Sequence, residues 1–376
     1  MSEVLSLFLV LFVVYISQCI AAAPDNCAVF VVSGSLKGRV LRHYWKAGSA
    51  QHRVFLLNPF LPVEGAAYVE NVPFILLCGP SGECDRVEFL SSSGGKDDRK
   101  AVLLNARPDI ASHGKQIFVN GEVFVSLPSE ASAKRTKAAL RRLQEVPPKK
   151  RLSVLDGELA GRFSRESLDK RLRLYADVTP YLHAACWSLF LLLFLLTPLL
   201  VFFVGLHGIW PGLLAYMAVV YLLVVILFYR ADRKLYRGER QGGAQRILTI
   251  ALSPLAAIRA NQSLVANLVS GFHPLTVAHR ILRAEDFLEF ARSELRRTEF
   301  LHGDAVLLRH CKEFLARENV DVKELLKAPN PESPRSRSFC PACLTQFVIE
   351  SGACQDCGGV SLHPFAGDSV ERCGSE

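Results

Sequence analysis

Residues 184–229 read AACWSLFLLLFLLTPLLVFFVGLHGIWPGLLAYMAVVYLLVVILFY and contain no Asp, Glu, Lys or Arg. One membrane-spanning helix needs about 20 apolar residues, so a stretch of this length predicts two helices. The segment GLHGIWPG at 205–212 interrupts the stretch, and its glycines and proline favour a turn. A buried hairpin of a soluble domain is disfavoured because no polar face is available to water. The stretch therefore predicts a transmembrane helical hairpin with both ends on one side.

Basic residues flank this hairpin at both ends. Segments rich in Lys and Arg that lie close to spanning helices stay in the cytoplasm. Both flanks, and the soluble regions attached to them, are therefore expected on the cytoplasmic side of the cell membrane. The flanking residues are Lys170, Arg171 and Arg173 before the hairpin, and Arg230, Arg233, Lys234, Arg237 and Arg240 after it.

A second uncharged run extends from Val4 to Ala23. Its length suits a spanning anchor, whereas its apolar core and small terminal residues also suit a cleaved signal peptide. Against cleavage, the run is preceded by Glu3 instead of Lys or Arg, and Pro24 follows the expected cleavage site. A cleaved signal would also export the basic flanks of the hairpin. We therefore expect residues 1–23 to be an uncleaved N-terminal anchor, with a cleaved signal peptide as the alternative.

Short apolar runs of strand length fill residues 24–130, separated by clusters of Gly, Pro, Ser and Asp. The clearest hairpin is QIFVNGEVFVSL, in which Asn120-Gly121 supplies a two-residue turn. A helical pattern follows from Glu130. Strands followed by a helix predict a small α+β domain over residues 24–150. A juxtamembrane segment at 151–183, helical over 156–176, is expected to lead into the hairpin.

The end of this domain is strongly basic. Such a cluster either contacts anionic lipid headgroups or forms a solvated helix face and linker, and the second interpretation is the simpler one. The basic residues between 134 and 151 are Lys134, Arg135, Lys137, Arg141, Arg142, Lys149, Lys150 and Arg151, against the single acidic residue Glu145.

Residues 230–328, after the hairpin, predict an amphipathic helical region. Within it, Ile247–Ile258 is apolar but too short to span a membrane. His302, His310 and Cys311 are expected to be surface or packed side chains rather than metal-binding or catalytic groups. Residues 329–338 are rich in proline and predict a flexible linker. The expected apolar face comprises Phe287, Leu288, Ala291 and Leu295, then Val306, Cys311, Phe314 and Leu315.

The tail contains CPACLTQFVIESGACQDCGG, in which two CxxC pairs are separated by ten residues. Four thiolates can surround one Zn²⁺ ion at tetrahedral corners. Pro341 stiffens the first pair, and Gly358 permits the positive φ that follows the second. The pattern resembles the zinc-ribbon family over about residues 338–364. The resemblance implies a zinc-ribbon module, assigned to 339–366, whose zinc ligands are Cys340, Cys343, Cys354 and Cys357.

Paired CxxC units also hold rubredoxin-like iron or act as redox dithiols, but no thioredoxin-like βαβ pattern surrounds these two. With all four positions filled by protein, a zinc ion here is expected to be structural. From Ser338 to Glu371 the sequence contains no Lys or Arg. A surface that binds phosphates needs cations, so nucleic-acid binding is disfavoured and contact with an unidentified protein partner is expected.

The other seven cysteines are scattered, as expected for reduced thiols in the cytosol. Cys78 and Cys84, with five residues between them, are the two that are placed to form a disulfide in an oxidising compartment.

The sequence as a whole predicts a multi-domain integral membrane protein rather than a soluble enzyme. Half of its residues are hydrophobic, and a net charge of +8 fits several kinds of partner. GPSGE at 79–83 lacks the Lys-Ser/Thr of a phosphate-binding loop, and neither a nucleophile elbow nor HExxH occurs. We expect a membrane-anchored binding or scaffold protein. The alternatives are an extracytoplasmic protein with a cleaved signal and an accessory subunit of a transport or envelope-assembly complex, and an enzyme is less favoured.

Overall fold

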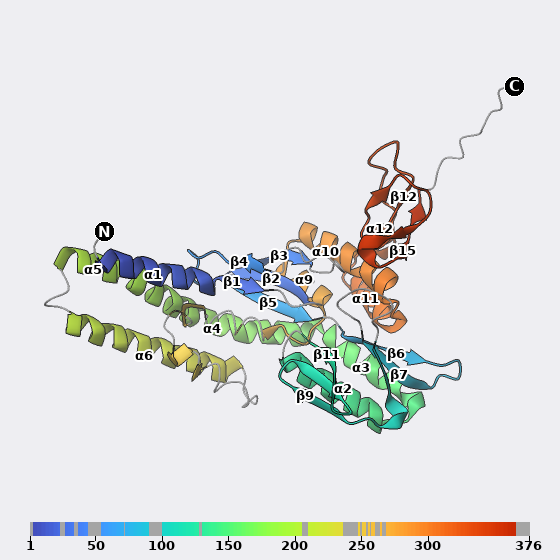
Figure 1. Cartoon of the computed structure of the whole chain (residues 1–376), viewed down its shortest axis with the longest axis horizontal. Helices are drawn as coiled ribbons and strands as arrows, with labels where there is room; N and C mark the ends of the chain where they lie inside the picture. The colour runs from blue at the N-terminus through green and yellow to red at the C-terminus, as the bar shows by residue number, and fades with distance from the viewer. Residues whose placement is uncertain are drawn as a thin grey trace. The chain divides into compact units, whose positions relative to one another are not determined.

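A computed structural model gives the fold of the chain (Figure 1). The described residues group into two compact units, each assembled from segments that are far apart in the sequence. Unit 1 falls within Met1–Tyr44, His52–Glu70 and Ser164–Arg283, and unit 2 within Trp45–Gln51, Asn71–Phe163 and Ala284–Glu376. The structure describes residues 3–22, 27–33, 37–43, 54–70, 72–89, 100–127, 130–204, 210–235, 247–248, 250–252, 255, 257–259, 264 and 268–365.

Two long apolar helices dominate unit 1. The first is continuous through α4 (Arg165–Leu191), a π-helical turn (Leu192–Leu196) and α5 (Thr197–Val204), and the second is α6 (Trp210–Leu235). Both are long and apolar enough to cross a membrane. The expectation of two helices is therefore confirmed, although the first begins well before residue 184. The central turn residues 205–209 lie outside the described part of the chain.

The ends of these helices lie together, as a hairpin requires. Lys234 near the end of α6 places its Nζ 3.6 Å from Oδ2 of Asp177 in α4. Helices α4 and α6 are also in contact. The described basic residues of the second flank therefore lie at the same end of the hairpin as the start of the first helix.

The π-helical turn has a local cause in Pro198. Proline lacks an N–H, and its ring clashes with the carbonyl four residues earlier in a regular α-helix. The wider π-helical turn just before Pro198 relieves this conflict. The Leu192 carbonyl accepts the Thr197 backbone N–H in this turn, and the Thr197 hydroxyl donates to the same carbonyl at 2.6 Å.

The N-terminal segment forms a short helix, α1 (Glu3–Gln18), of 16 residues. A helix of this length extends about 24 Å, less than the ~30 Å of a hydrocarbon core. Helix α1 packs on the first long apolar helix, where the rings of Phe12 and Phe194 are 5.5 Å apart. Strand β1 (Ile20–Ala22) follows it and pairs antiparallel with β4 (Val54–Leu56). The segment is thus part of the packed structure of unit 1.

A buried arginine holds the end of this segment in place. The Arg259 guanidinium is 5% exposed and donates to the carbonyls of Asn58 and Glu64 at 2.9 and 3.1 Å. The same group lies 2.8 Å from Sγ of Cys19 and stacks over the ring of Tyr15, 5.3 Å from its centroid. Arg259 follows directly on the apolar run 247–258, which is only partly described.

The sheet of unit 1 has the strand order β3-β2-β5 and is antiparallel. Its strands are β2 (Cys27–Ser33), β3 (Lys37–His43) and β5 (Gly65–Glu70). The central strand is buried from Cys27 to Val32, which explains its continuous run of apolar residues. Helix α9 (Pro274–Ile281) contacts all three strands.

The described residues of unit 2 before helix α2 (Glu130–Glu145) contain two further three-stranded antiparallel sheets. One has the order β6-β7-β8 and the other β11-β10-β9, and α2 contacts β9 and β10. The predicted Asn120-Gly121 turn is confirmed, because both residues have positive φ, 52° and 84°. The strands are β6 (Phe74–Cys78), β7 (Cys84–Phe89), β8 (Ala101–Leu103), β9 (Ile110–His113), β10 (Gln116–Val119) and β11 (Glu122–Ser126). The SSSGGKDD segment at 91–98 lies outside the described residues.

The segment GPSGE forms the turn of the β6–β7 hairpin, and a disulfide between Cys78 and Cys84 closes it. Gly79 N–H donates to the Glu83 carbonyl at 2.9 Å. The glycine-rich run therefore connects two strands. A phosphate-binding loop would instead lead into a helix.

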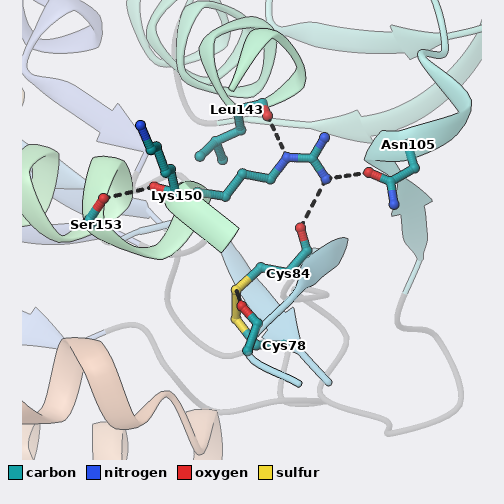
Figure 2. The surroundings of a disulfide bond; sticks show 8 residues. Cys78, Cys84, Asn105, Leu143, Lys150 and Ser153 are labelled. Atoms are coloured by element: carbon teal, nitrogen blue, oxygen red, sulfur yellow. Dashed lines mark hydrogen bonds between the residues drawn. A yellow bond between two sulfur atoms is a disulfide. The ribbon is translucent and has the colours of Figure 1, made fainter. Parts of the chain in front are cut away.

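The residue that secures this hairpin is Arg151, which is 3% exposed. Its Nε donates to the Leu143 carbonyl at 2.6 Å, and its Nη1 donates to the Cys84 carbonyl at 2.9 Å and to Asn105 Oδ1 at 2.7 Å. Figure 2 shows the three acceptors converging on one guanidinium group. Arg151 therefore belongs to the interior, and it does not contribute to the basic surface predicted for 134–151.

The single helix predicted over 156–176 is wrong. Helix α3 (Arg151–Arg162) ends before Phe163, and α4 starts anew at Arg165. Ser164 caps the new helix, since its Oγ accepts from Ser167 N–H at 3.3 Å. The periodicity of apolar residues continues through this break, which is why the pattern alone did not reveal it.

The helical prediction for the later part of the chain is confirmed by α10 (Ala284–Arg297), α11 (Ala305–Arg317) and α12 (Val322–Leu326). Phe287, Ala291 and Leu295 are buried as expected. Leu288, however, is 44% exposed, and Phe290 takes its place in the core. Farther along, Cys311, Phe314 and Leu315 are buried, whereas Val306 is half-buried.

Replacing Arg151 by methionine should destabilise unit 2 by about 3 kcal/mol, because the buried carbonyls of Leu143 and Cys84 would lose a charged donor. The neighbouring Lys150 is exposed, so Lys150→Met should stay within about 0.5 kcal/mol of the parent protein. Thermal unfolding in detergent, followed by circular dichroism, measures both variants. Equal midpoints for the two would contradict the role assigned to Arg151.

Candidate metal centre

The four cysteines of the CxxC pairs converge on one point of unit 2. Their Sγ atoms all lie within 4.8 Å of one another, and Sγ of Cys343 is 3.8 Å from Sγ of Cys354. Four sulfurs placed about 2.3 Å from a common centre at tetrahedral corners would be about 3.8 Å apart. The cluster therefore has the size and donor set of a four-thiolate metal site.

Two similar turns present these thiols. In the first, Leu344 N–H donates to the Cys340 carbonyl at 2.8 Å, and in the second Gly359 N–H donates to the Cys354 carbonyl at 2.9 Å. Each pair is followed by a residue with φ of 63°, Leu344 after the first and Gly358 after the second. The positive φ predicted for Gly358 is confirmed. The first turn places a leucine in the same conformation, which the sequence did not indicate.

Short strands surround the turns. Strands β12 (Ser338–Phe339), β13 (Gln346–Phe347) and β16 (His363–Pro364) form one sheet, and β14 (Ala353–Cys354) pairs with β15 (Val360–Ser361). The buried core they enclose consists of Cys340, Cys354 and Leu362. So small a core contributes little to folding by apolar burial. A metal ion held by the four thiolates would supply the missing stabilisation.

The cysteines differ in exposure and in acidity. Cys340 and Cys354 are buried, whereas Cys343 is exposed. Hydrogen bonds from Cys340 and Cys357 lower the pKa of Cys343, which favours a thiolate at the exposed corner. Hydrogen bonding with Cys343 raises the pKa of Cys340 to about 11. Thiols that keep their protons at neutral pH must release them when they bind a metal ion.

The segment expected as a linker, 329–338, is hydrogen-bonded to this module. The Gln346 side chain accepts from Glu332 N–H and donates to the Asn330 carbonyl, both at 2.8 Å. Arg337 N–H donates to the Phe347 carbonyl at 2.8 Å. These bonds join the proline-rich segment to β13.

The remaining candidates from the sequence lie elsewhere in unit 2. His310 pairs with Asp156 through Nε2 at 2.8 Å and stacks on the ring of Phe163. Cys311 is fully buried, and burial raises the pKa of its thiol. Both are packed side chains. The side chain of His302, residue 366 and Cys373 lie outside what the structure describes.

Sequence reasoning missed one residue next to the centre. Arg296 of α10 is buried, and its Nη1 donates to the carbonyl of Pro341, which lies between Cys340 and Cys343, at 3.1 Å. In the sequence, Arg296 is one of several basic residues in a helical segment, and no motif distinguishes it from the others.

The chain was compared with protein-family models, with curated proteins and with solved structures, and none of the three comparisons gives a match. The site therefore has to be interpreted from its own geometry.

We expect the intact protein to bind one equivalent of a metal ion at this cluster, with tetrahedral coordination. Cys354→Ser should abolish stoichiometric binding, because a buried corner of the tetrahedron would be lost. Cys373→Ser, outside the CxxC pairs, is the matched control and should bind normally. Metal content by mass spectrometry and the thiolate absorption of the Co²⁺-loaded protein give the measurement, and equal binding by the two variants would contradict the assignment.

Proposed function

We propose that this chain is a membrane-anchored binding or scaffold protein, and that its four-cysteine module is a structural zinc ribbon that contacts another protein. The observation that carries the membrane part is the exposure of the hairpin. In the most apolar window of each spanning helix, 28% and 11% of the residues are buried. Phe202 and Phe203 are 81% and 77% exposed. Apolar surface of this extent needs a non-aqueous environment, and a lipid bilayer supplies it.

Zinc is the proposed ion because it favours four thiolates in a tetrahedron and has no redox chemistry of its own. Iron in a rubredoxin-like site would use the same ligands. The tight turns and the small core support a folding role for the ion. All four positions are filled by protein, so the centre leaves no open position for a substrate.

The proposed partner of the ribbon is a protein. Val348 and Ile349, in the segment between β13 and β14, are 70% and 51% exposed. Glu350 follows them, and the absence of Lys and Arg from Ser338 to Glu371 disfavours a phosphate backbone as ligand. An exposed apolar pair without cations fits contact with an apolar protein surface.

The proposed location of unit 2, and of the part of unit 1 outside the hairpin, is the cytoplasm. The basic flanks of the hairpin support this, and the Lys234–Asp177 pair keeps those flanks at one end. The packing of α1 supports retention of residues 1–23, since Tyr15 and Cys19 are fully buried and cleavage would remove both from around Arg259. A contact between residues 134–151 and anionic lipid is a weaker proposal, because Lys134 and Arg142 pair with Glu130 and Glu158.

One observation favours the extracytoplasmic alternative, in which a signal peptide is cleaved. The Cys78–Cys84 disulfide is a bond that persists in oxidising compartments. The same geometry would hold two neighbouring thiols in a reducing one. The redox state of this pair in cells therefore separates the two locations.

We expect impermeant thiol reagents to miss single reporter cysteines at Ser92 and at Ser336 in intact cells, in a protein otherwise stripped of reactive thiols. Both positions should be labelled once the membrane is permeabilised. In the unmodified protein, rapid alkylation followed by peptide mass spectrometry should find Cys78 and Cys84 reduced. Labelling at both reporters together with an intact disulfide would favour export, and labelling at one alone would contradict the hairpin.

A photocrosslinking residue at Val348 should capture a protein in living cells, because this side chain is the most exposed large apolar group among the described residues of the ribbon. The same residue at Glu332, exposed in the neighbouring segment, is the control and should give a weaker adduct. Dependence of the Val348 adduct on intact Cys354 would tie the contact to the metal-bound fold. An RNA adduct, or no adduct, would contradict the proposal.

A further inference from the structure

The four-cysteine module is attached to the helices of unit 2 through Arg296. This side chain is 1% exposed, although it carries a guanidinium group. Its Nη1 donates to the Pro341 carbonyl at 3.1 Å and its Nε to the Leu325 carbonyl at 3.2 Å. Its Nη2 donates to the Lys327 carbonyl. One side chain of α10 therefore joins the end of α12 to the first CxxC turn.

The planar shape of the guanidinium group makes these three contacts interdependent. Its N–H groups point in fixed directions, so a carbonyl that moves away cannot be followed without disturbing the others. A buried charged donor that loses its acceptor pays the full desolvation cost. The position of the Pro341 carbonyl and the conformation of the chain at Leu325 and Lys327 are therefore linked.

Pro341 lies inside the turn that orients two of the four thiols. Its neighbours in that turn are fixed by backbone bonds, from Cys340 N–H to the Thr345 carbonyl at 2.9 Å and from Leu344 N–H to the Cys340 carbonyl. A donor that holds the Pro341 carbonyl thus restricts the whole turn. This is how outer groups orient the ligands of a metal ion.

A second contact joins the same elements. Phe300, in the π-helical turn Thr298–His302 that continues α10, packs edge-on against His363 of β16, with ring centroids 5.8 Å apart. His363 in turn packs against Phe339 of β12, 6.0 Å away. The module is therefore held at its first CxxC turn and at its sheet by residues four positions apart on one helical segment.

We infer that Arg296 is a positioning residue of the metal centre, and that it couples occupancy of the centre to the order of helices α10 and α12. This inference rests on the proposed four-thiolate site. A metal ion fixes the CxxC turn and with it the acceptor of Arg296, which in turn holds Leu325 and Lys327. By thermodynamic linkage, the ordered helices strengthen metal binding to the same degree. The centre thus stabilises a binding surface larger than the ribbon itself.

Hydrogen exchange of the full chain in detergent, before and after chelation, tests the coupling. Metal removal should speed exchange in 338–365 and also in 322–328 and 294–300. The β9–β11 sheet and α2 serve as the internal reference and should not change. Faster exchange confined to 338–365 would overturn the coupling while leaving the metal site intact. A starting protein without stoichiometric metal would overturn the site itself.

Variants of α10 provide a second readout. In the Co²⁺-loaded protein, Arg296→Gln should keep the tetrahedral thiolate spectrum but release metal to a competing chelator about tenfold faster. Arg296→Lys should release metal almost as fast as Arg296→Gln, because an ammonium group cannot donate to all three carbonyls at once. Arg292→Gln, at an exposed position of the same helix, should match the parent. Equal release rates for the Arg292 and Arg296 variants would overturn the positioning role.

Discussion

The helical hairpin of unit 1 imposes the main constraint on this protein, because the described chain leaves most of its apolar surface exposed. Charged groups are absent from 184 to 229, and the packing within unit 1 leaves most of the two helices exposed. The Asp177–Lys234 pair holds the open ends together. The short α1 helix packs on the hairpin through Phe12 and Tyr15, whose rings contact Phe194.

Buried arginines are the second recurring feature. Arg259 in unit 1, and Arg151 and Arg296 in unit 2, each donate to at least one carbonyl in a loop, in a turn or at the end of a strand that lies far away in the sequence. Carbonyls at loops and helix ends lack partners in regular secondary structure, and burying them unpaired is costly. Arginine has a long side chain with five N–H donors, so one residue can donate to several of these carbonyls at once.

Cysteine has two distinct roles within unit 2, and the local backbone separates them. Cys78 and Cys84 face each other across a two-stranded hairpin, so their thiols meet as a pair. Each CxxC instead lies in a tight turn that aims both thiols to the same side, and two such turns bring four sulfurs together. The first arrangement brings two sulfurs to bonding distance, and the second groups four sulfurs in a cluster of the size of a metal site. The second also reaches beyond its own strands, because Arg296 ties it to the helices.

The sequence by itself determined the features that depend on local pattern. An uncharged run of sufficient length indicates two apolar helices, Asn-Gly between alternating segments indicates a hairpin, and the spacing of Cys340, Cys343, Cys354 and Cys357 indicates a four-thiolate cluster. Each of these features depends on residues that are close in the sequence, within one turn, one strand pair or one short module.

What only the tertiary structure decided depends on contacts between distant segments. The break at Phe163–Ser164 falls inside a continuous apolar period, and it is set by a cap rather than by hydrophobicity. Leu288 is exposed and Phe290 is buried, because the elements that pack on α10 determine which face of this helix is covered. In the sequence, the three buried arginines resemble surface residues. They are Arg151, Arg259 and Arg296. The carbonyls that accept their hydrogen bonds come together only when the chain folds. For the same reason, the assembly of unit 1 from the first strands, the hairpin and α9 has no signature in any single segment.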